Sequence, residues 1–193
     1  EHYNVISAFI KSLRGSDVHA SLYYLARMVE AGEDPMFVAR RLVVFASEDV
    51  GNADPRALQI ALAAKEAVHF LGLPEAKYAL SQATAYLATA PKSNSAGGYF
   101  EAAKAVREYG ALPVPNHLRN APTRLMKELG YGDGYEYPHS FDGNHVAQQH
   151  LPDELRDRRF FTAGDQGFEK TIAERMKIWE SRQERGVRNK RRK

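Results

Sequence analysis

The chain has 193 residues, of which 44% are hydrophobic and 26% are charged, the composition of an ordinary globular protein. It contains no cysteine, which excludes disulfide frameworks, thiolate nucleophiles, zinc fingers and iron–sulfur clusters and suits a reducing, cytoplasmic setting. No apolar run approaches the roughly 20 residues that cross a bilayer, and no charged start with an apolar core indicates a targeting segment.

The net charge of +3 is unevenly distributed along the chain. Residues 169–193 hold ten Lys or Arg against four Asp or Glu, so they carry +6 and residues 1–168 carry −3. The basic character therefore lies at the C-terminal end. Its last residues, 186–193, are predicted to form a disordered basic tail.

Helix start and stop signals recur through the first hundred residues and predict six consecutive helices. Asn4, then Ser16 or Asp17, are expected to cap the first two, and the Asp-Pro pairs at 34–35 and 54–55 open the third and fourth. The expected helices lie at residues 5–13, from 17 to before Gly32, from 35 onward, 55–71, 74–90 and 95–109.

Apolar and alanine-rich faces predict that these helices pack closely against one another. The second helix presents Leu22, Leu25, Ala26 and Val29, the third Val38, Leu42, Phe45 and Ala46, and the fourth and fifth Ala61, Ala64, Ala67, Ala79, Ala83 and Ala90. Seven aromatic residues are expected in the core or in subunit contacts: Tyr3, Tyr23, Tyr24, Phe37, Phe45, Tyr78 and Tyr86.

The second half of the chain is less regular because prolines and glycines interrupt it. We expect a short helix at 123–129, an ordered but irregular wrap at 130–167 that is functional or held to the core by aromatic side chains, and a last helix at 168–185. The fold class is thus all-α, a compact helical bundle or collar followed by the wrap and a C-terminal helix. Its predicted parts are residues 1–110, 111–185 and 186–193.

Motifs of common catalytic sites are absent from the sequence, so no catalytic, cofactor-binding or metal residue is predicted. There is no glycine-rich phosphate loop before Lys92-Ser93, and no G-x-S-x-G, H-E-x-x-H or G-x-G-x-x-G string. His139, His145 and His150 follow no ligand spacing. Glu48 and Asp49 point roughly 100° apart on a helix, which favours solvation of a helix C-terminus or an inter-helix salt bridge over paired acid–base chemistry.

Two groups of cations are candidate DNA-binding residues. One is Arg119, Arg124 and Lys127 in the segment 117–132, and the other is Arg185, Arg188, Lys190, Arg191, Arg192 and Lys193 near the C-terminus. The structural alternative for the first group is that Arg119 binds free carbonyls while Leu125, Met126 and Leu129 are buried against the bundle. The alternative for the second is a solvated tail that keeps the protein soluble.

Several long strings resemble the C-terminal region of the replication-associated recombination protein A family, also called MgsA, whose eukaryotic relative is the Werner helicase interacting protein. They are residues 2–17 (HYNVISAFIKSLRGSD), 22–28 (LYYLARM), 31–35 (AGEDP), 45–51 (FASEDVG) and 117–122 (HLRNAP). The resemblance implies a piece of a clamp-loader-related AAA+ ATPase whose nucleotide-binding core and lid lie upstream of Glu1. ATP and magnesium would then be cofactors of the whole protein and not of this region.

The resemblance also implies action at stalled replication forks in DNA replication, recombination and repair, binding of DNA, association with single-stranded DNA-binding protein, and homotetramers built through this helical region. The expected location is the cytoplasm, associated with the nucleoid. Our first hypothesis is an oligomerisation collar that is not itself an enzyme. The alternative is a DNA-binding module that uses the two groups of cations, and an independent hydrolase is disfavoured.

Overall fold

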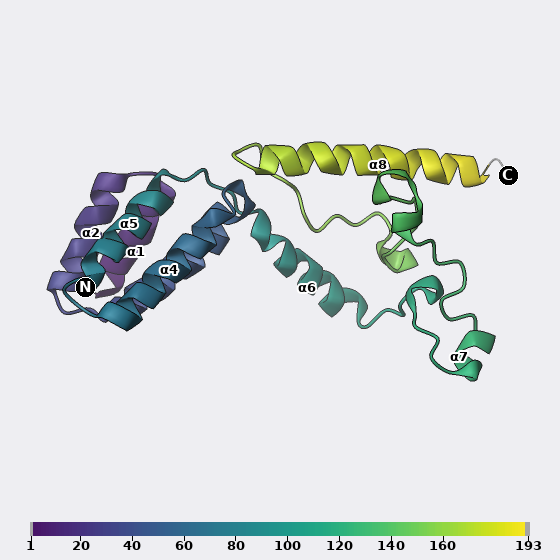
Figure 1. The fold of residues 1–193 in the computed structure, drawn as a ribbon, viewed down its shortest axis with the longest axis horizontal. Coiled ribbons are helices and arrows are strands. Elements are labelled where there is room, and N and C mark those ends of the chain that lie inside the picture. The colour runs from purple at the N-terminus through teal and green to yellow at the C-terminus, as the bar shows by residue number, and fades with distance from the viewer. Residues whose placement is uncertain (1, 192–193) are drawn as a thin grey trace. The chain divides into compact units, whose positions relative to one another are not determined.

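The computed structural model describes the backbone of residues 2–191 and the side chains of residues 3–186. Within this range every regular element is helical (Figure 1). The α-helices are α1 (His2–Arg14), α2 (Val18–Glu30), α3 (Pro35–Phe45), α4 (Arg56–Leu71), α5 (Ala76–Thr89), α6 (Gly98–Tyr109), α7 (Arg124–Glu128) and α8 (Glu169–Arg191). The predicted all-α fold class is confirmed.

The chain divides into two compact units, each built from two stretches of sequence. Unit 1 comprises Glu1–Gly98 and Phe161–Ile172, and unit 2 comprises Tyr99–Phe160 and Ala173–Lys193. This division falls at other residues than the predicted boundaries at 110 and 185. A stretch distant in sequence, 161–172, is thus part of the same unit as the first five helices.

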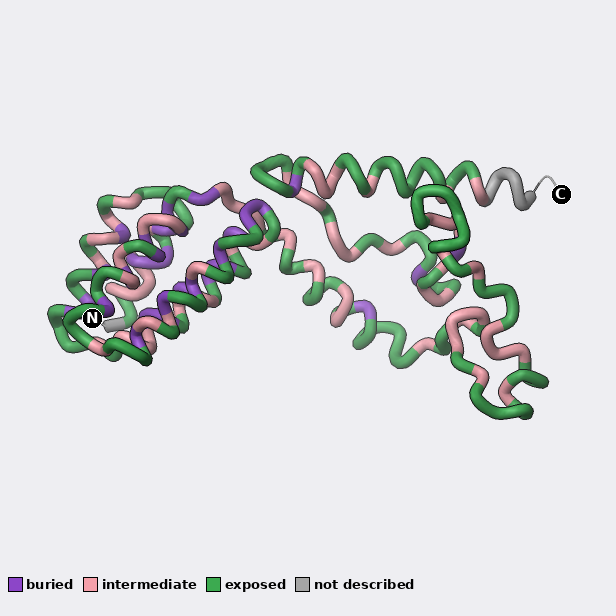
Figure 2. The backbone as a smooth tube through the Cα atoms, in the orientation of Figure 1, coloured by how far each residue is buried: buried purple, intermediate pink, exposed green. Residues whose placement is uncertain are grey.

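Unit 1 is a bundle of α1–α5 in which α5 packs against the other four helices. The predicted face of α3 is confirmed, because Val38, Leu42, Phe45 and Ala46 are all buried. Of the predicted alanines, Ala61, Ala64, Ala83 and Ala90 are buried and Ala67 and Ala79 are half-buried. The expected burial of Ala26 on α2 is wrong, since it is exposed and Met28 is buried instead. Figure 2 shows the concentration of buried residues in this bundle.

Local hydrogen bonds account for most of the helix ends in unit 1. The Asp17 side chain accepts from the Ala20 amide at 2.9 Å, which makes Asp17 the cap of α2. After α2, the amides of Gly32 and Glu33 donate back to the carbonyls of Val29 and Met28 at 3.1 and 3.0 Å, and Gly32 has a φ of 84°. This closing turn needs the left-handed conformation that glycine adopts without strain. The expected cap at Asn4 is wrong, because α1 already begins at His2.

After α3 the chain makes a π-helical turn (Ala46–Val50) and a 3₁₀ turn (Gly51–Ala53), which the sequence did not predict. The turn directs Asp49 toward α1, where Arg14 Nε and Nη2 donate to its two carboxylate oxygens at 2.6 and 3.2 Å. The predicted inter-helix salt bridge is therefore confirmed for Asp49, while Glu48 is exposed. The Asp49 carbonyl also accepts from the Ser93 amide at 2.8 Å.

Unit 2 contains few buried side chains, and polar contacts hold its irregular part. The Gln148 amide group donates to the Glu136 carbonyl at 2.8 Å and accepts from the Glu136 amide at 3.3 Å. The expectation that aromatic side chains pack the wrap onto a core is wrong for Tyr135, Tyr137 and Phe141, which are 40% to 57% exposed. Backbone and amide hydrogen bonds order this segment instead.

The last helix extends further than predicted. Its backbone is helical through Arg191, beyond the predicted end at Arg185, and disorder of the basic tail at 186–193 stays a prediction. At Gly186 an added Cβ would lie 2.2 Å from Cβ of Ala147, so the glycine permits a close approach of the wrap to α8. Gly186 is therefore a packing position inside a helix and not a helix end.

Candidate functional site

The Arg119 side chain contacts a backbone carbonyl and an aromatic ring of the segment around it. Its Nε donates to the Val114 carbonyl at 2.6 Å, and its guanidinium carbon lies 4.8 Å from the ring centre of Tyr131. The side chain is half-buried. The structural interpretation of Arg119 as a ligand of free carbonyls is confirmed. Because the Arg119 guanidinium is already stacked and hydrogen-bonded, it has fewer free N–H donors for a phosphate.

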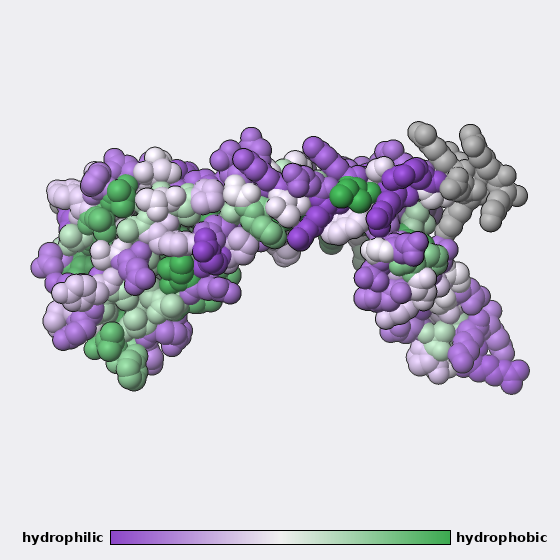
Figure 3. All heavy atoms as spheres, turned by 45° about the horizontal axis from the view of Figure 1, so that its top comes forward, coloured by the Kyte–Doolittle hydropathy of each residue, from purple (hydrophilic) through white to green (hydrophobic). Residues whose placement is uncertain are grey.

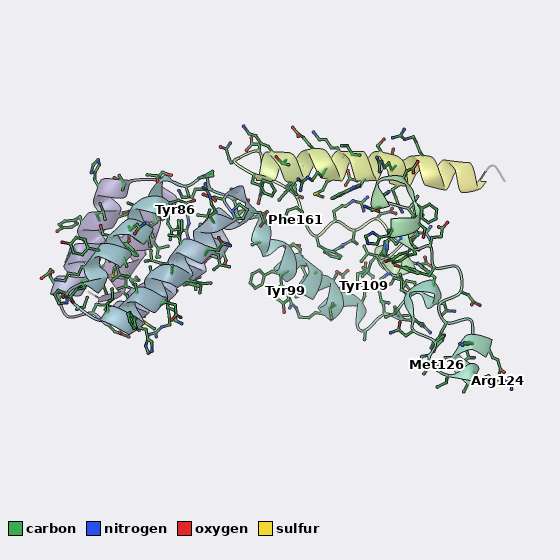
Figure 4. The ribbon with its side chains drawn as sticks, in the orientation of Figure 1. Tyr86, Tyr99, Tyr109, Arg124, Met126 and Phe161 are labelled. Carbon is green, nitrogen blue, oxygen red and sulfur yellow. The ribbon has the colours of Figure 1, made fainter. Side chains whose placement is uncertain are left out.

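Arg124 and Lys127 lie on the short helix α7, and both are exposed. Figure 4 labels Arg124 on this helix. The Arg124 side chain is 93% exposed, and its Nε forms an ion pair with Glu128 at 2.8 Å. The expected burial of Leu125 and Leu129 against the bundle is wrong, since they are 64% and 56% exposed. The helix thus presents both cations and apolar side chains to solvent.

A pocket of about 380 Å³ lies beside Arg119 in unit 2. His117, Asp153 and Glu154 contribute to its lining, together with three prolines. His117 Nε2 is hydrogen-bonded to the Gln149 carbonyl at 2.7 Å, and Asp153 accepts from Arg156 at 2.8 Å. Because acidic and basic groups share the lining, this pocket has no net attraction for an anion of the kind that a phosphate cradle needs.

Only Arg185 of the C-terminal cations has a described side chain. It is exposed, and its Nε donates to the Ser181 carbonyl at 3.2 Å along the same helix. The side chains of the other predicted cations lie outside the described residues: Arg188, Lys190, Arg191, Arg192 and Lys193. Their role in DNA binding stays a prediction.

Large apolar side chains are exposed where α4 passes into α5. Phe70 is 87% exposed, Leu71 52%, Leu73 42% and Tyr78 85%. We call these four residues the α4–α5 patch. Figure 3 shows hydrophobic side chains at the surface of the bundle among hydrophilic ones. The four residues lie within nine positions of the chain, and a group of exposed large apolar side chains commonly marks a contact with another macromolecule.

A second apolar surface is a groove of about 270 Å³ between α2 and α5. Leu22, Leu25, Val29 and Leu80 line it, together with Ala26 and Ser81, and the ion pair of Lys77 Nζ with Glu30 at 2.6 Å lies at the same groove. The predicted face of α2 therefore faces this groove in part. Ala26, which was expected in the core, is exposed because it lines this groove.

Two buried carboxylates stabilise unit 1 in ways that the sequence did not indicate. Glu169, the first residue of α8, is fully buried and accepts hydrogen bonds from Ser93 Oγ at 2.8 Å, from Ser95 Oγ and from the Gly164 amide. Ser93 therefore binds Glu169, which lies 76 positions further along the chain. No local pattern could have shown this contact.

Asp54 is the second buried carboxylate. Burial alone would raise the pKa of Asp54, but hydrogen bonds from the Tyr86 hydroxyl and from Arg56 outweigh it and leave that pKa below its ordinary value. The carboxylate also accepts from the Arg56 amide at 3.1 Å, at the start of α4. Asp54 thus joins α4 to Tyr86 on α5.

Lys92 is also occupied by protein groups. Its Nζ donates to the carbonyls of Ala88 and Ala90 at 2.9 and 2.6 Å and to Ser16 Oγ at 3.1 Å. Burial lowers the pKa of Lys92, although the charge of Asp49 opposes the shift. Lys92 and Ser93 therefore close the bundle and do not form a phosphate loop.

Metal-ligand clusters and membrane-spanning helices are both absent from the described part of the chain. No group of three or more His, Asp or Glu side chains within it is placed to hold a metal ion. No helix there is long and apolar enough to cross a membrane.

Comparison with known proteins gives consistent matches over most of the chain. A family model described as MgsA AAA+ ATPase C terminal matches residues 15–180. Replication-associated recombination protein A of Coxiella burnetii is 50% identical over 92% of the chain, and that of Escherichia coli K12 is 48% identical over 90%. ATPase WRNIP1 of Dictyostelium discoideum is 47% identical over 82%.

The chain spans only part of these relatives, namely 41%, 39% and 18% of their respective lengths. The matched family model is that of a C-terminal region, and it covers α2–α7 and about half of α8. The resemblance noted in the sequence is confirmed. The chain belongs to the MgsA family of AAA+ ATPases, in which it corresponds to the C-terminal region.

Proposed function

We propose that this chain is the oligomerisation domain of a clamp-loader-related AAA+ ATPase that acts in DNA replication, recombination and repair at stalled forks. The α4–α5 patch is the observation that carries the assembly role, because two of its aromatic side chains are 85% or more exposed. Membership in the MgsA family and the names of the relatives, which refer to replication-associated recombination, support the rest.

Burial of the α4–α5 patch between copies would supply the free energy that holds an assembly together. Apolar area removed from water contributes roughly 25 cal/mol per Å². A stable interface buries about 800 Å² on each partner, so the patch would be its apolar centre and not its whole extent. A homotetramer requires a closed symmetric arrangement of such contacts.

Light scattering on the 193-residue chain tests this proposal. We expect an assembly larger than a monomer at micromolar concentration, and a double substitution of Phe70→Ser and Tyr78→Ser should shift it to a monomer. The matched control is Tyr23→Ser, an aromatic residue on α2 that is 60% exposed and lies outside the patch. A monomeric unsubstituted chain, or equal loss of assembly in the control, would contradict the proposal.

Within this proposal, ATP and Mg²⁺ are bound by the ATPase region of the whole protein, and single-stranded DNA-binding protein is a partner of the assembly at the nucleoid. The isolated chain should then hydrolyse no ATP. ATP hydrolysis that stays with the chain through further purification would contradict the non-enzymatic role.

A second candidate function is DNA binding through exposed cations. The exposure of Arg124 and Lys127 on α7 favours it, while the engagement of Arg119 removes that residue from the first group. If about five ions are released on binding, affinity falls roughly 500-fold between 50 and 200 mM salt. Fluorescence anisotropy with single-stranded DNA should show a smaller salt slope after truncation at Glu184, and an unchanged slope would exclude the C-terminal cations.

A further inference from the structure

A third group of cations lies in unit 1, distant in sequence from the two groups of cations that were predicted to bind DNA. A cleft of about 220 Å³ is lined by α1 residues Ile6, Ser7, Ile10, Lys11 and Arg14 and by Arg41 of α3. The α1 residues recur at spacings of three and four, so they share one side of that helix. Arg41 reaches the same cleft from another helix.

The charges around this cleft are not balanced. Arg14 is neutralised by its double hydrogen bond to Asp49, and Glu48, one position before Asp49 on the same turn, is an exposed carboxylate. No ion pair to Lys11 or Arg41 is formed by the side chains that the structure describes. The cleft therefore has two cations that no acidic side chain of the described part neutralises directly.

Arg41 also contains a buried donor without an acceptor. Its Nε is shielded from solvent and makes no hydrogen bond to any group of the described chain. An unsatisfied buried donor costs roughly 1–3 kcal/mol, and more when it is charged, so native proteins retain few of them. Arg41 therefore has unused hydrogen-bonding capacity while its side chain lines the cleft.

The neighbouring residue shows that this situation is specific to Arg41. Arg40 is one position earlier on α3, is exposed and forms an ion pair with Asp34 at 3.4 Å. Two consecutive arginines thus have opposite environments, one paired at the surface and one half-buried in the cleft without a partner. The pair supplies a matched comparison of equal charge.

We propose that the cleft of Lys11, Arg14 and Arg41 is a binding site for the phosphate group of a ligand. A guanidinium presents several donors in a fixed plane, and an ammonium beside it adds a rotatable donor, a combination that suits an oxyanion with several acceptor oxygens. Two unneutralised cations match the −1.5 to −2 charge of a phosphate monoester better than the single charge of a carboxylate. The proposal is independent of the α4–α5 patch.

Inorganic phosphate is the first probe, added to the ¹⁵N-labelled 193-residue chain at constant ionic strength against a chloride control. We expect NMR shift changes that saturate and are centred on residues 7–14 and 40–43. Arg41→Gln should weaken phosphate binding by about tenfold or more, because a charge-assisted contact is lost, whereas Arg40→Gln should change it by less than about twofold.

Folding is checked by the same variants. Because the unpartnered Nε of Arg41 costs free energy in the folded chain, Arg41→Gln should not lower the melting temperature in chloride, unlike a substitution of a structural arginine. Lys11→Gln, at an exposed position, should also weaken phosphate binding and serves if the first variant unfolds. Absence of saturable shifts, or equal effects of the Arg40 and Arg41 substitutions, would overturn the proposal.

Single-stranded DNA without a terminal phosphate identifies the source of the phosphate. If Arg41→Gln weakens both phosphate and DNA binding, the ligand is a nucleic-acid backbone. If it weakens phosphate binding alone, the site takes a free phosphate or a small phosphorylated molecule. Both results support a phosphate site, and they differ only in the molecule that occupies it.

Discussion

Units 1 and 2 differ in what holds them together. The core of unit 1 contains buried side chains from all five helices, and Phe9, Leu42 and Leu80 are fully buried. In unit 2, the buried side chains within the described residues are those of Ala105, Gln148 and Leu155. Apolar burial thus stabilises the first unit, whereas hydrogen bonds between side chains and backbone order the second.

The largest expected effect tests that difference directly. Leu42→Ala should destabilise unit 1 by about 3–4 kcal/mol, because it leaves a cavity in a packed core. Leu155→Ala in unit 2 should cost about 2 kcal/mol, at the low end of such substitutions, because Ala105 is the other buried apolar residue of that unit in the described chain. Amide hydrogen exchange measured separately for the two units distinguishes them. Equal losses of protection would show that both units have cores of similar quality.

The next prediction concerns the attachment of residues 161–172 to the bundle of unit 1. Gly167 has a φ of 53°, and an added Cβ would lie 2.1 Å from the Ala53 carbonyl oxygen, so Gly167→Ala should cost about 2–3 kcal/mol. Faster proteolysis within 161–172 would report it. Gly97→Ala is the control, because an added Cβ there meets nothing within 4 Å. A stable, protease-resistant Gly167→Ala variant would contradict the close approach.

The buried carboxylate of Asp54 predicts a pH dependence in unit 1. Its pKa is lower in the folded chain, so its contribution is complete above the unfolded value near 4 and is lost as pH falls through the folded pKa. Asp54→Asn should cost about 2 kcal/mol at neutral pH and much less at pH 3. Urea unfolding at both pH values measures the difference. A cost that is the same at both would exclude a role for the charge.

The smallest effects compare one buried polar group in each unit. Thr84 Oγ1 is buried in the core of unit 1 without a partner among the described groups, so Thr84→Val should stabilise by about 1 kcal/mol. Gln148 is hydrogen-bonded on both sides, so Gln148→Leu should destabilise unit 2 by about 1–2 kcal/mol. Thermal unfolding should show a higher melting temperature for Thr84→Val and a lower one for Gln148→Leu. Changes of the same sign in both variants would refute this contrast.

Much of unit 1 could be predicted from sequence because its signals are local. Asp17 and Asp34 cap helices through hydrogen bonds that span two or three residues, and Gly32 and Gly72 end helices with a positive φ that glycine adopts freely. The same local logic failed at Gly186, which resembles a helix stop but is a contact with Ala147. Composition could not distinguish the two, since the contact involves a residue 39 positions away.

The candidate sites were less predictable than the fold. Arg119, Arg124 and Lys127 share one segment, yet the structure stacks the first on Tyr131 and exposes the other two. Arg41 was not predicted as a site residue, because no pattern among its sequence neighbours distinguishes it from Arg40. Arg41 lines one cleft with residues of α1 and has an unpartnered Nε, and neither feature can be seen in a local sequence pattern.

The sequence alone determined the helical class, the positions of most helix ends and the family, because capping, periodicity and family strings are properties of neighbouring residues. Tertiary structure alone decided that α5 contacts all four other helices of the bundle, that Glu169 is buried against Ser93 and Ser95, and that Lys11 and Arg41 line one cleft. Lys11 and Arg41 are 30 positions apart, and Ser93 and Glu169 are 76 positions apart. The free energy of these contacts depends on burial and geometry that no short stretch of chain contains.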